Sequence, residues 1–370
     1  MNRKSLSALV SVLMLVVVVL AACGTTAECP TTTPCPECPK CPEATAVAAP
    51  APSGKARLQI VQERGKLICG TNGSLPGFSY LDPATNQMSG LDADICKAVA
   101  VAVFGDATKI EWRTLSTKER SVALQTGEID MLARNTTWTS SRDATWGLFA
   151  PTTFYDGQTV MVTKSLNATK LEDLAGASIC VQTGTTTELN LTDQMRARNV
   201  EFTPVVFEDI DATYAAYEEG RCDAITSDRS QLISRRTVMK NPDDHLIMDV
   251  VMSKEPLGPA VPLGDDQWFN VVRWTVFVLI QAEESGITSE NVDTFKDTQN
   301  PEIRRLLGIE GDLGTQLGLK NDWVGPVIKQ VGNYGEIFER NLGPGTPFNL
   351  ARGLNDLWTN GGLLYPPPYR

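Results

Sequence analysis

The sequence predicts an α/β protein with two similar lobes, and three observations support this fold class. Residues 112–135 and 205–228 read alike at an offset of 93 positions, which indicates an internal repeat. Each repeat unit follows the order strand, helix, strand, helix, strand, which is typical of a parallel sheet covered by helices. About 315 residues follow residue 55, which is enough for two lobes of ordinary domain size.

The elements of the two units can be assigned in order. In the first unit, a strand (KLICGTN, 66–72) leads through a loop to a helix (DADICKAVAVAVF, 92–104). In the second unit, the corresponding segments are ASICVQTG (177–184) and TTTELNLTDQMRARN (185–199). Each repeat segment then adds a strand, an amphipathic helix and a Gly-x-x-Asp turn that opens another apolar strand. Chance similarity of α/β segments is the alternative to a true repeat.

Two segments are expected to connect the lobes. FYDGQTVMVTK (154–164) is a strand-like run that leads into the second unit, and an amphipathic helix (265–286) suits a chain that returns to the first. Two crossings make a hinge with a cleft between the lobes. The expected boundaries are 55–155 for lobe 1, 156–252 for lobe 2, 253–300 for the return to lobe 1, and 301–370 for a C-terminal extension.

The N-terminal segment predicts export. Arg3 and Lys4 precede a short apolar run, Leu6–Leu20, which has the layout of a secretory signal and is short for a membrane-spanning helix. It ends in Leu-Ala-Ala-Cys23, which resembles the lipobox of bacterial lipoproteins. Residues 1–22 would be the signal peptide, and Cys23 would carry the lipid, although a plain signal peptide is the alternative. The protein is therefore expected at the cell membrane, facing the periplasm or the cell exterior.

Residues 23–54 form a Pro-rich and Cys-rich linker with few large apolar side chains, so an extended tether is expected. The spacing of its cysteines superficially resembles a metal or iron–sulfur pattern. However, each cysteine after Cys23 is followed by proline and no histidine lies nearby, so no metal is predicted. Disulfides within or between linkers are the preferred interpretation for these four cysteines: Cys29, Cys35, Cys38 and Cys41.

The overall charge and the histidine content exclude several function classes. Removing residues 1–22 changes the net charge from −11 to −13, which argues against nucleic acid as a partner. The one histidine, His245, lies in the polar segment NPDDHL and is expected in a solvated loop. A single histidine expected in a solvated loop therefore argues against catalysis that depends on histidine.

The other four cysteines are expected to form disulfides. Cys69 ends a predicted strand and Cys96 lies on the helix that follows, while Cys180 and Cys222 belong to the second unit. An even number of cysteines in an exported protein favours the pairs Cys69–Cys96 and Cys180–Cys222, because only this pairing keeps each bond within one lobe. Buried free thiols are the alternative.

Several motifs together carry a family resemblance: LPGFSYLD, KERSVALQTGEIDML, RNTTWTSSRD, FYDGQTVMV, VQTGTTTELN, GRCDAITSDRS and GGLLYPPPYR. In this order they resemble the general L-amino-acid-binding proteins of polar amino-acid ABC transporters, over about residues 60–370. The resemblance implies a type II periplasmic-binding-protein fold and a free L-amino acid in the cleft, with polar, acidic and amide side chains favoured. It also implies delivery to an ABC permease by a monomer, without cofactor or reaction.

The resemblance assigns the ligand's α-carboxylate to residues of both lobes. Arg142 would clamp it, since a guanidinium can donate two parallel hydrogen bonds to a carboxylate. Thr137 would add a backbone N–H and a hydroxyl donor. Thr185 and Thr186 follow a glycine at the start of a helix and would complete the site from lobe 2. An N-capping run with a surface arginine is the alternative for these motifs.

Five further residues are candidates for the remainder of the ligand. The resemblance implies that Asp228 pairs with the α-ammonium, and its repeat counterpart Asn135 lies at the same strand end in lobe 1. Asn72 lies in a loop expected to wall the cleft, where distant relatives that prefer basic amino acids carry aspartate. Arg134 could bind an acidic or amide side chain or form a structural ion pair. Phe78 could cover the ligand or pack in the core.

Two other functions fit the same scaffold. An exported dehydratase-like enzyme would need a general acid or base facing the cleft, for which Glu188 is the candidate, although a surface helix position accounts for it as well. A ligand-sensing protein for a signalling partner is the second alternative. Such proteins usually carry a spanning helix and a signalling module, and neither is evident in the sequence.

Overall fold

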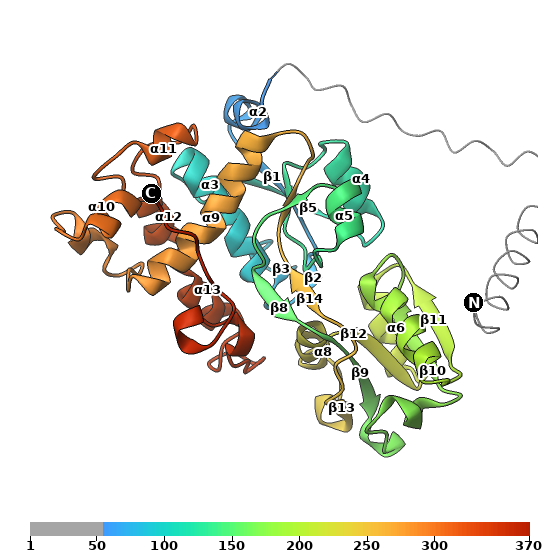
Figure 1. Cartoon of the computed structure of the whole chain (residues 1–370). Helices are drawn as coiled ribbons and strands as arrows, with labels where there is room; N and C mark the ends of the chain where they lie inside the picture. The colour runs from blue at the N-terminus through green and yellow to red at the C-terminus, as the bar shows by residue number, and fades with distance from the viewer. Residues whose placement is uncertain (1–54) are drawn as a thin grey trace, which may run out of the picture. The chain divides into compact units, whose positions relative to one another are not determined.

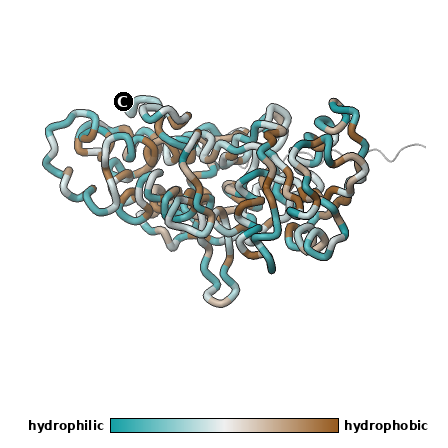
Figure 2. Tube along the Cα trace, turned by 90° about the horizontal axis from the view of Figure 1, so that it is seen from below, coloured by the Kyte–Doolittle hydropathy of each residue, from teal (hydrophilic) through white to brown (hydrophobic). Residues whose placement is uncertain are grey.

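The computed structural model describes residues 55–370 (Figure 1). The predicted signal peptide, the lipid attachment point Cys23 and the Cys-Pro repeat lie outside the described residues. Among residues 55–370, no helix is both long enough and apolar enough to cross a membrane. Hydrophilic segments occupy many of the outer turns, while apolar segments run through the interior (Figure 2).

The described chain contains two five-stranded sheets, and the first lies in lobe 1. Strand β1 pairs in parallel with β5 and β6, and β15 then pairs antiparallel with both β6 and β7. The strand order is β5 (Ile110–Thr114), β1 (Leu67–Thr71), β6 (Met131–Leu132), β15 (Ala260–Val261) and β7 (Leu148–Phe149).

The second sheet lies in lobe 2 and repeats this plan. Strand β10 pairs in parallel with β11 and β12, and β9 pairs antiparallel with β12 and β13. The strand order is β11 (Thr203–Phe207), β10 (Ser178–Gln182), β12 (Ala224–Asp228), β9 (Gln158–Thr163) and β13 (His245–Ile247). The expectation of parallel sheets is therefore right for three strands of each sheet. Strands β9 and β15 arrive from the other lobe without a crossover helix, so they join in the antiparallel sense.

Two strands cross between the lobes as a ribbon. β8 (Phe154–Asp156) pairs antiparallel with β14 (Glu255–Leu257), and Asp156 lies opposite Glu255. Three short strands form a separate small sheet: β2 (Ser74–Leu75), β3 (Ser79–Leu81) and β4 (Met88–Ser89). Residues on either side of the ribbon belong to different sheets, so the ribbon is the hinge that the sequence predicted.

Helices cover the sheets of both lobes. They are α2 (Arg57–Arg64), α3 (Leu91–Phe104), α4 (Glu119–Gln125), α5 (Ser140–Thr145), α6 (Thr186–Ala197), α7 (Ile210–Glu218), α8 (Arg229–Arg236), α9 (Asp266–Glu284), α10 (Pro301–Leu306), α11 (Leu313–Gln316), α12 (Val324–Val331) and α13 (Tyr334–Asn341). Helix α3 is buried along most of its length because α9, α12 and α13 pack against it (Figure 1). Its continuous apolar sequence reflects this double coverage.

The C-terminal extension packs against the first crossing strand. Tyr334 Oη donates a hydrogen bond to the Thr153 carbonyl at 2.7 Å, and the ring of Phe338 stacks on that of Phe154. The Asn355 amide bonds both backbone groups of Tyr155, accepting from its N–H at 2.6 Å and donating to its carbonyl at 3.1 Å. Asn355 thus takes the place of a neighbouring strand on the free edge of β8.

The structure joins Cys69 to Cys96 and Cys180 to Cys222, the two pairs that the sequence favoured. His245 differs from expectation, since it is buried on β13 with Nδ1 2.9 Å from Tyr217 Oη. The expectation of a solvated loop was wrong because the polar residues before His245 hide the start of a short edge strand.

We expect the Cys180→Ser/Cys222→Ser double variant to lose about 2–4 kcal/mol of unfolding free energy, because the bridge spans 42 residues and restricts the unfolded chain. Chemical denaturation of oxidised protein measures this loss. Reductant should lower the denaturation midpoint of the wild type by more than that of the variant, which keeps only the lobe 1 bridge. Equal midpoints for oxidised wild type and variant would contradict the prediction.

Candidate functional site

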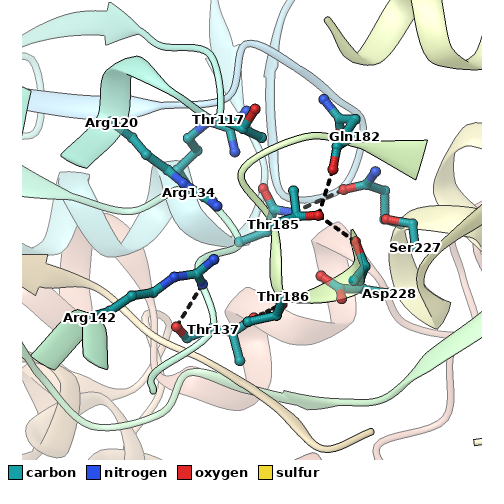
Figure 3. A pocket seen from close by; sticks show the side chains of 13 residues that line it. Thr117, Arg120, Arg134, Thr137, Arg142, Gln182, Thr185, Thr186, Ser227 and Asp228 are labelled. Carbon is teal, nitrogen blue, oxygen red and sulfur yellow. Dashed lines mark hydrogen bonds between the residues drawn. The ribbon is translucent and has the colours of Figure 1, made fainter. Parts of the chain in front are cut away.

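A buried pocket lies between the lobes, at the carboxyl ends of the central strands. Its cavity is about 20 Å³, which is room for one or two water molecules. Figure 3 shows three arginines of lobe 1 on one side and Gln182, Ser227 and Asp228 of lobe 2 on the other. Seven of the nine ligand residues expected from the sequence line it: Arg134, Asn135, Thr137, Arg142, Thr185, Thr186 and Asp228.

Arg142 is held rigidly inside the pocket. It lies in α5, where the Thr139 hydroxyl caps its backbone N–H. Its Nη1 donates to the Thr137 carbonyl at 2.9 Å, and its guanidinium lies 4.7 Å from the ring centroid of Trp146. Burial lowers the pKa of Arg142, and the nearby carboxylates of Glu255 and Asp228 oppose that shift. The remaining guanidinium donors are therefore positioned for an anion.

Two more arginines share this pocket. Arg120, on α4, donates to Thr136 Oγ1 at 3.2 Å and, across the lobes, to the Gly184 carbonyl at 3.3 Å. Burial lowers its pKa well below the usual range, and the charges of Arg134 and Arg142 lower it further. Burial also lowers the pKa of Arg134 to about 10. Its Nε donates to the Leu115 carbonyl at 2.8 Å, so its other nitrogens are available to the cavity. Three cations facing one cavity favour an anionic occupant.

Asp228 supplies the opposite charge from lobe 2. It is the last residue of β12 and is 5% exposed. Burial raises its pKa well above the ordinary value, and the neighbouring Asp156 and Glu255 carboxylates raise it further. Its Oδ1 has no hydrogen-bond partner among the described residues. A cationic group placed beside Asp228 would relieve both the repulsion and the missing hydrogen bond.

The threonine run at the start of α6 forms another wall. Thr185 is the N-cap, since its Oγ1 accepts from the Glu188 N–H and donates to the Gln182 carbonyl at 2.7 Å. Glu188 in turn accepts the Gly184 N–H at 2.8 Å, so it closes a capping arrangement. The suggestion of Glu188 as a general acid or base therefore has no support here, because its carboxylate caps the helix and does not line the pocket.

The hydroxyl of Thr137, predicted to donate to the ligand, already has a protein partner in this structure. It donates to Glu255 Oε2 at 2.6 Å. Glu255 lies on the crossing strand β14 and is 1% exposed. The motif that contains Thr137 gives no sign of this partner, because Glu255 is more than a hundred residues downstream.

Two expected ligand residues lie outside this pocket. Phe78 is 1% exposed and packs edge-to-face against Phe154, with centroids 5.2 Å apart, so it belongs to the core. Of the two roles left open for Phe78, packing is the one observed, because its ring contacts Phe154 and lines neither cavity. Asn72 donates to Asn135 Oδ1 at 3.3 Å and lines a second, larger cavity of about 460 Å³. Arg134 and Gln182 line both cavities.

Comparison with known proteins identifies the family. The sequence profile described as Bacterial extracellular solute-binding proteins, family 3, matches residues 67–284. The chain belongs to this family. Its fold is the type II periplasmic-binding-protein fold with two lobes.

Close homologues are amino-acid-binding periplasmic proteins of ABC transporters. The chain is 55% identical over 328 residues to the General L-amino acid-binding periplasmic protein AapJ of Rhizobium johnstonii, covering 88% of this chain and 96% of AapJ. It is 47% identical to the Glutamate/glutamine/aspartate/asparagine-binding protein BztA of Rhodobacter capsulatus, covering 88% and 97% of the two chains. An ABC transporter periplasmic binding protein from Brucella ovis, with glutathione bound, is similar in structure. That similarity has a TM-score of 0.83 at 51% identity and covers 85% and 100% of the two chains.

Sequence analysis of this family 3 protein missed several pocket residues. Arg120 sits in a helical run, KERSVALQTG, whose pattern gives no reason to separate it from surface charges. Gln231 lies on α8, beyond the repeat segment that ends in Asp228, and its Oε1 accepts from the Asn135 amide at 3.0 Å. The internal repeat offered one usable signal, since it placed Asn135 and Asp228 at equivalent strand ends.

Proposed function

We propose that this protein captures free L-amino acids outside the cytoplasm and delivers them to the membrane permease of an ABC importer. The observation that carries the proposal is the pairing of charges in one buried pocket. Arg142 from lobe 1 suits an α-carboxylate, and Asp228 from lobe 2 suits an α-ammonium. Since the cavity of about 20 Å³ is too small for an amino acid, the lobes would have to move apart to admit one, which would then bridge both lobes.

The preferred ligands are acidic and amide amino acids. Once Arg142 and Asp228 have neutralised the α-groups, Arg120 and Arg134 leave excess positive charge in the pocket. A side-chain carboxylate would balance this charge, and an amide oxygen could accept hydrogen bonds from the same donors. Asn72, in place of the aspartate found in relatives that prefer basic amino acids, agrees with this preference. The name of BztA lists the same acidic and amide amino acids: glutamate, glutamine, aspartate and asparagine.

The protein is proposed to act as a binding protein without catalysis, as a monomer held at the membrane by a lipid on Cys23. The lipobox-like end of the apolar run supports the anchor, and the extended linker after Cys23 would let the lobes reach the permease. The relatives' names support binding, and the sequence's candidate general acid or base, Glu188, caps a helix instead. Metabolic labelling with a fatty acid analogue tests the anchor, since Cys23→Ser should abolish the label.

A thermal-shift screen of the purified protein against the twenty L-amino acids tests the function. Ligands that bind only the folded protein raise the unfolding midpoint in proportion to the logarithm of their concentration over Kd. L-Glutamate, L-glutamine, L-aspartate and L-asparagine should give the largest shifts, and L-lysine and L-arginine the smallest. Absence of a shift with all twenty amino acids would contradict the proposal.

Ligands extended through the side chain form a second proposed class. The Brucella ovis relative has glutathione bound, and the 460 Å³ cavity adjoins the pocket through Arg134 and Gln182. A γ-glutamyl peptide keeps its α-ammonium and α-carboxylate on one carbon, so both would fit the pocket while the remainder occupies the larger cavity. An α-linked peptide has lost that α-carboxylate to the peptide bond.

We therefore expect γ-glutamylglycine to bind at least about 10-fold more tightly than its isomer α-glutamylglycine, which lacks one charge-assisted contact at the pocket. Isothermal titration calorimetry measures both affinities. Thr114→Trp, which narrows the larger cavity, should weaken γ-glutamylglycine but leave L-glutamate little changed. Equal affinities for the two isomers would contradict this ligand class without affecting the proposal for free amino acids.

A further inference from the structure

Glu255 is a buried carboxylate at which the two lobes and a crossing strand meet. It starts β14 in the hinge ribbon and is 1% exposed. Its Oε2 accepts from Thr137 Oγ1 of lobe 1 at 2.6 Å and from Thr186 Oγ1 of lobe 2 at 2.9 Å. Its Oε1 accepts from the Asn190 amide at 2.8 Å and from the Ser253 hydroxyl. Four neutral donors therefore replace the water that this carboxylate has lost.

These hydrogen bonds fix the direction of two hydroxyl groups that line the amino-acid pocket. A threonine hydroxyl has one hydrogen to donate and two lone pairs that accept. Thr137 and Thr186 each lie closer to the Glu255 oxygen than to one another, since their own oxygens are 3.3 Å apart. Charge-assisted hydrogen bonds are the stronger ones, so both hydrogens are committed to Glu255. The two oxygens therefore present only lone pairs to the pocket.

We propose that Glu255 is a specificity-determining positioning residue that turns Thr137 and Thr186 into a pair of acceptors for the ligand's ammonium group. One acceptor comes from each lobe, so the pair is complete only when the lobes are in contact. The two hydroxyls cannot donate to a carboxylate, which leaves that role to backbone N–H groups at the start of α6, and the pair therefore adds selectivity for the ligand's ammonium group. Glu255 acts through the two threonines and is not itself among the pocket's lining residues. This inference rests on the proposed amino-acid ligand.

The Glu255→Gln variant tests the proposal because the side chain keeps its size. A glutamine whose oxygen faces Asn190 and Ser253 must present its NH₂ group to Thr137 and Thr186. Both hydroxyls would then accept from glutamine and turn their hydrogens towards the pocket. We expect L-glutamate to bind about 10- to 100-fold more weakly, which is the size of a lost hydrogen bond to a charged group.

Glutarate, which is L-glutamate without its amino group, separates positioning from a structural role. Loss of the acceptor pair should spare glutarate, so the ratio of the glutarate Kd to the glutamate Kd should fall by the same 10- to 100-fold. A general loosening of the site would weaken both ligands equally and overturn the proposal. Asn190→Ala is the matched control, because it removes a different donor from the same carboxylate and lies outside the pocket. Its ratio should stay within about 3-fold of wild type.

A second pair of variants covers the case in which Glu255→Gln does not fold. Thr186→Val should lower the glutarate-to-glutamate ratio, and Thr186→Ser, which restores the hydroxyl, should recover it. Unchanged ratios in both Glu255→Gln and Thr186→Val would overturn the role of Glu255 while leaving the amino-acid function intact. If wild type binds no L-glutamate in the same calorimetric experiment, both this inference and the proposed function are wrong.

Discussion

Replacing Arg142 by alanine is expected to weaken L-glutamate binding by at least about 100-fold. The guanidinium of Arg142 is held by the Thr137 carbonyl and the face of Trp146, which leaves its other donors free for the ligand. Its loss removes up to two charge-assisted hydrogen bonds to the ligand's α-carboxylate, each of which contributes roughly 1.5–3 kcal/mol. Calorimetric titration of the purified protein with L-glutamate measures the change in affinity.

Two further substitutions sharpen this test. Arg142→Lys keeps the charge but not the planar fork, so it should recover only part of the affinity. Arg304→Ala is the matched control, because Arg304 pairs with Glu310 in the C-terminal extension and does not line the pocket. Near-normal binding by Arg142→Ala would mean that the carboxylate is held elsewhere, with Arg120 or Arg134 as the first alternatives.

The Asp228→Asn variant should also lose at least about 100-fold in affinity, because an uncharged amide cannot pair with the α-ammonium. Its effect on the ligand-free protein should be the reverse. The folded-state pKa of Asp228 is raised above its unfolded value, so ionised Asp228 destabilises the fold at pH values above that unfolded value. The variant should therefore be at least as stable as wild type at pH 8, as measured by thermal unfolding. A marked fall in its unfolding midpoint would contradict the prediction.

The same raised pKa predicts a proton linked to binding. The groups around Asp228 are Asp156 and Glu255 on the ribbon, which raise its pKa, and Arg142 and Arg120, which lower it. A bound ammonium would lower the pKa further, so binding should release a proton, and affinity should rise with pH through the titration of the ligand-free site. Calorimetry in two buffers of different ionisation enthalpy detects the proton. Asp228→Asn should show no such release, and a wild type without release would contradict the linkage.

The sequence predicted what its local patterns encode. The repeat predicted two related lobes, and the alternation of strands and helices placed Asn135 and Asp228 at equivalent strand ends. The cysteine positions relative to predicted strands led to the observed disulfides. Arg142 and Asp228 became candidates through the family resemblance of the motifs that contain them, and both line the pocket.

The remaining features depend on contacts between distant segments. Arg120 reads as part of an amphipathic helix, and only the packing of α4 against the cleft turns it inward. Glu255 follows a lysine in an irregular segment, and its role exists only because the ribbon brings Thr137 and Thr186 to it. Phe78 and His245 show the opposite problem, since their neighbours in sequence indicate loops while tertiary packing buries both.

The attachment of the C-terminal extension to β8 affects where the two crossing strands, β8 and β14, can bend when the lobes separate. Strand β8 is bonded by Asn355 along one edge and by β14 along the other, while the Thr153 carbonyl is tied to Tyr334. On this side of the ribbon, bending on opening would therefore be concentrated between β8 and β9, near Gly157. Substitutions of Tyr334 or Asn355, which make these contacts, would then alter affinity through the free energy of opening, at positions far from any ligand contact.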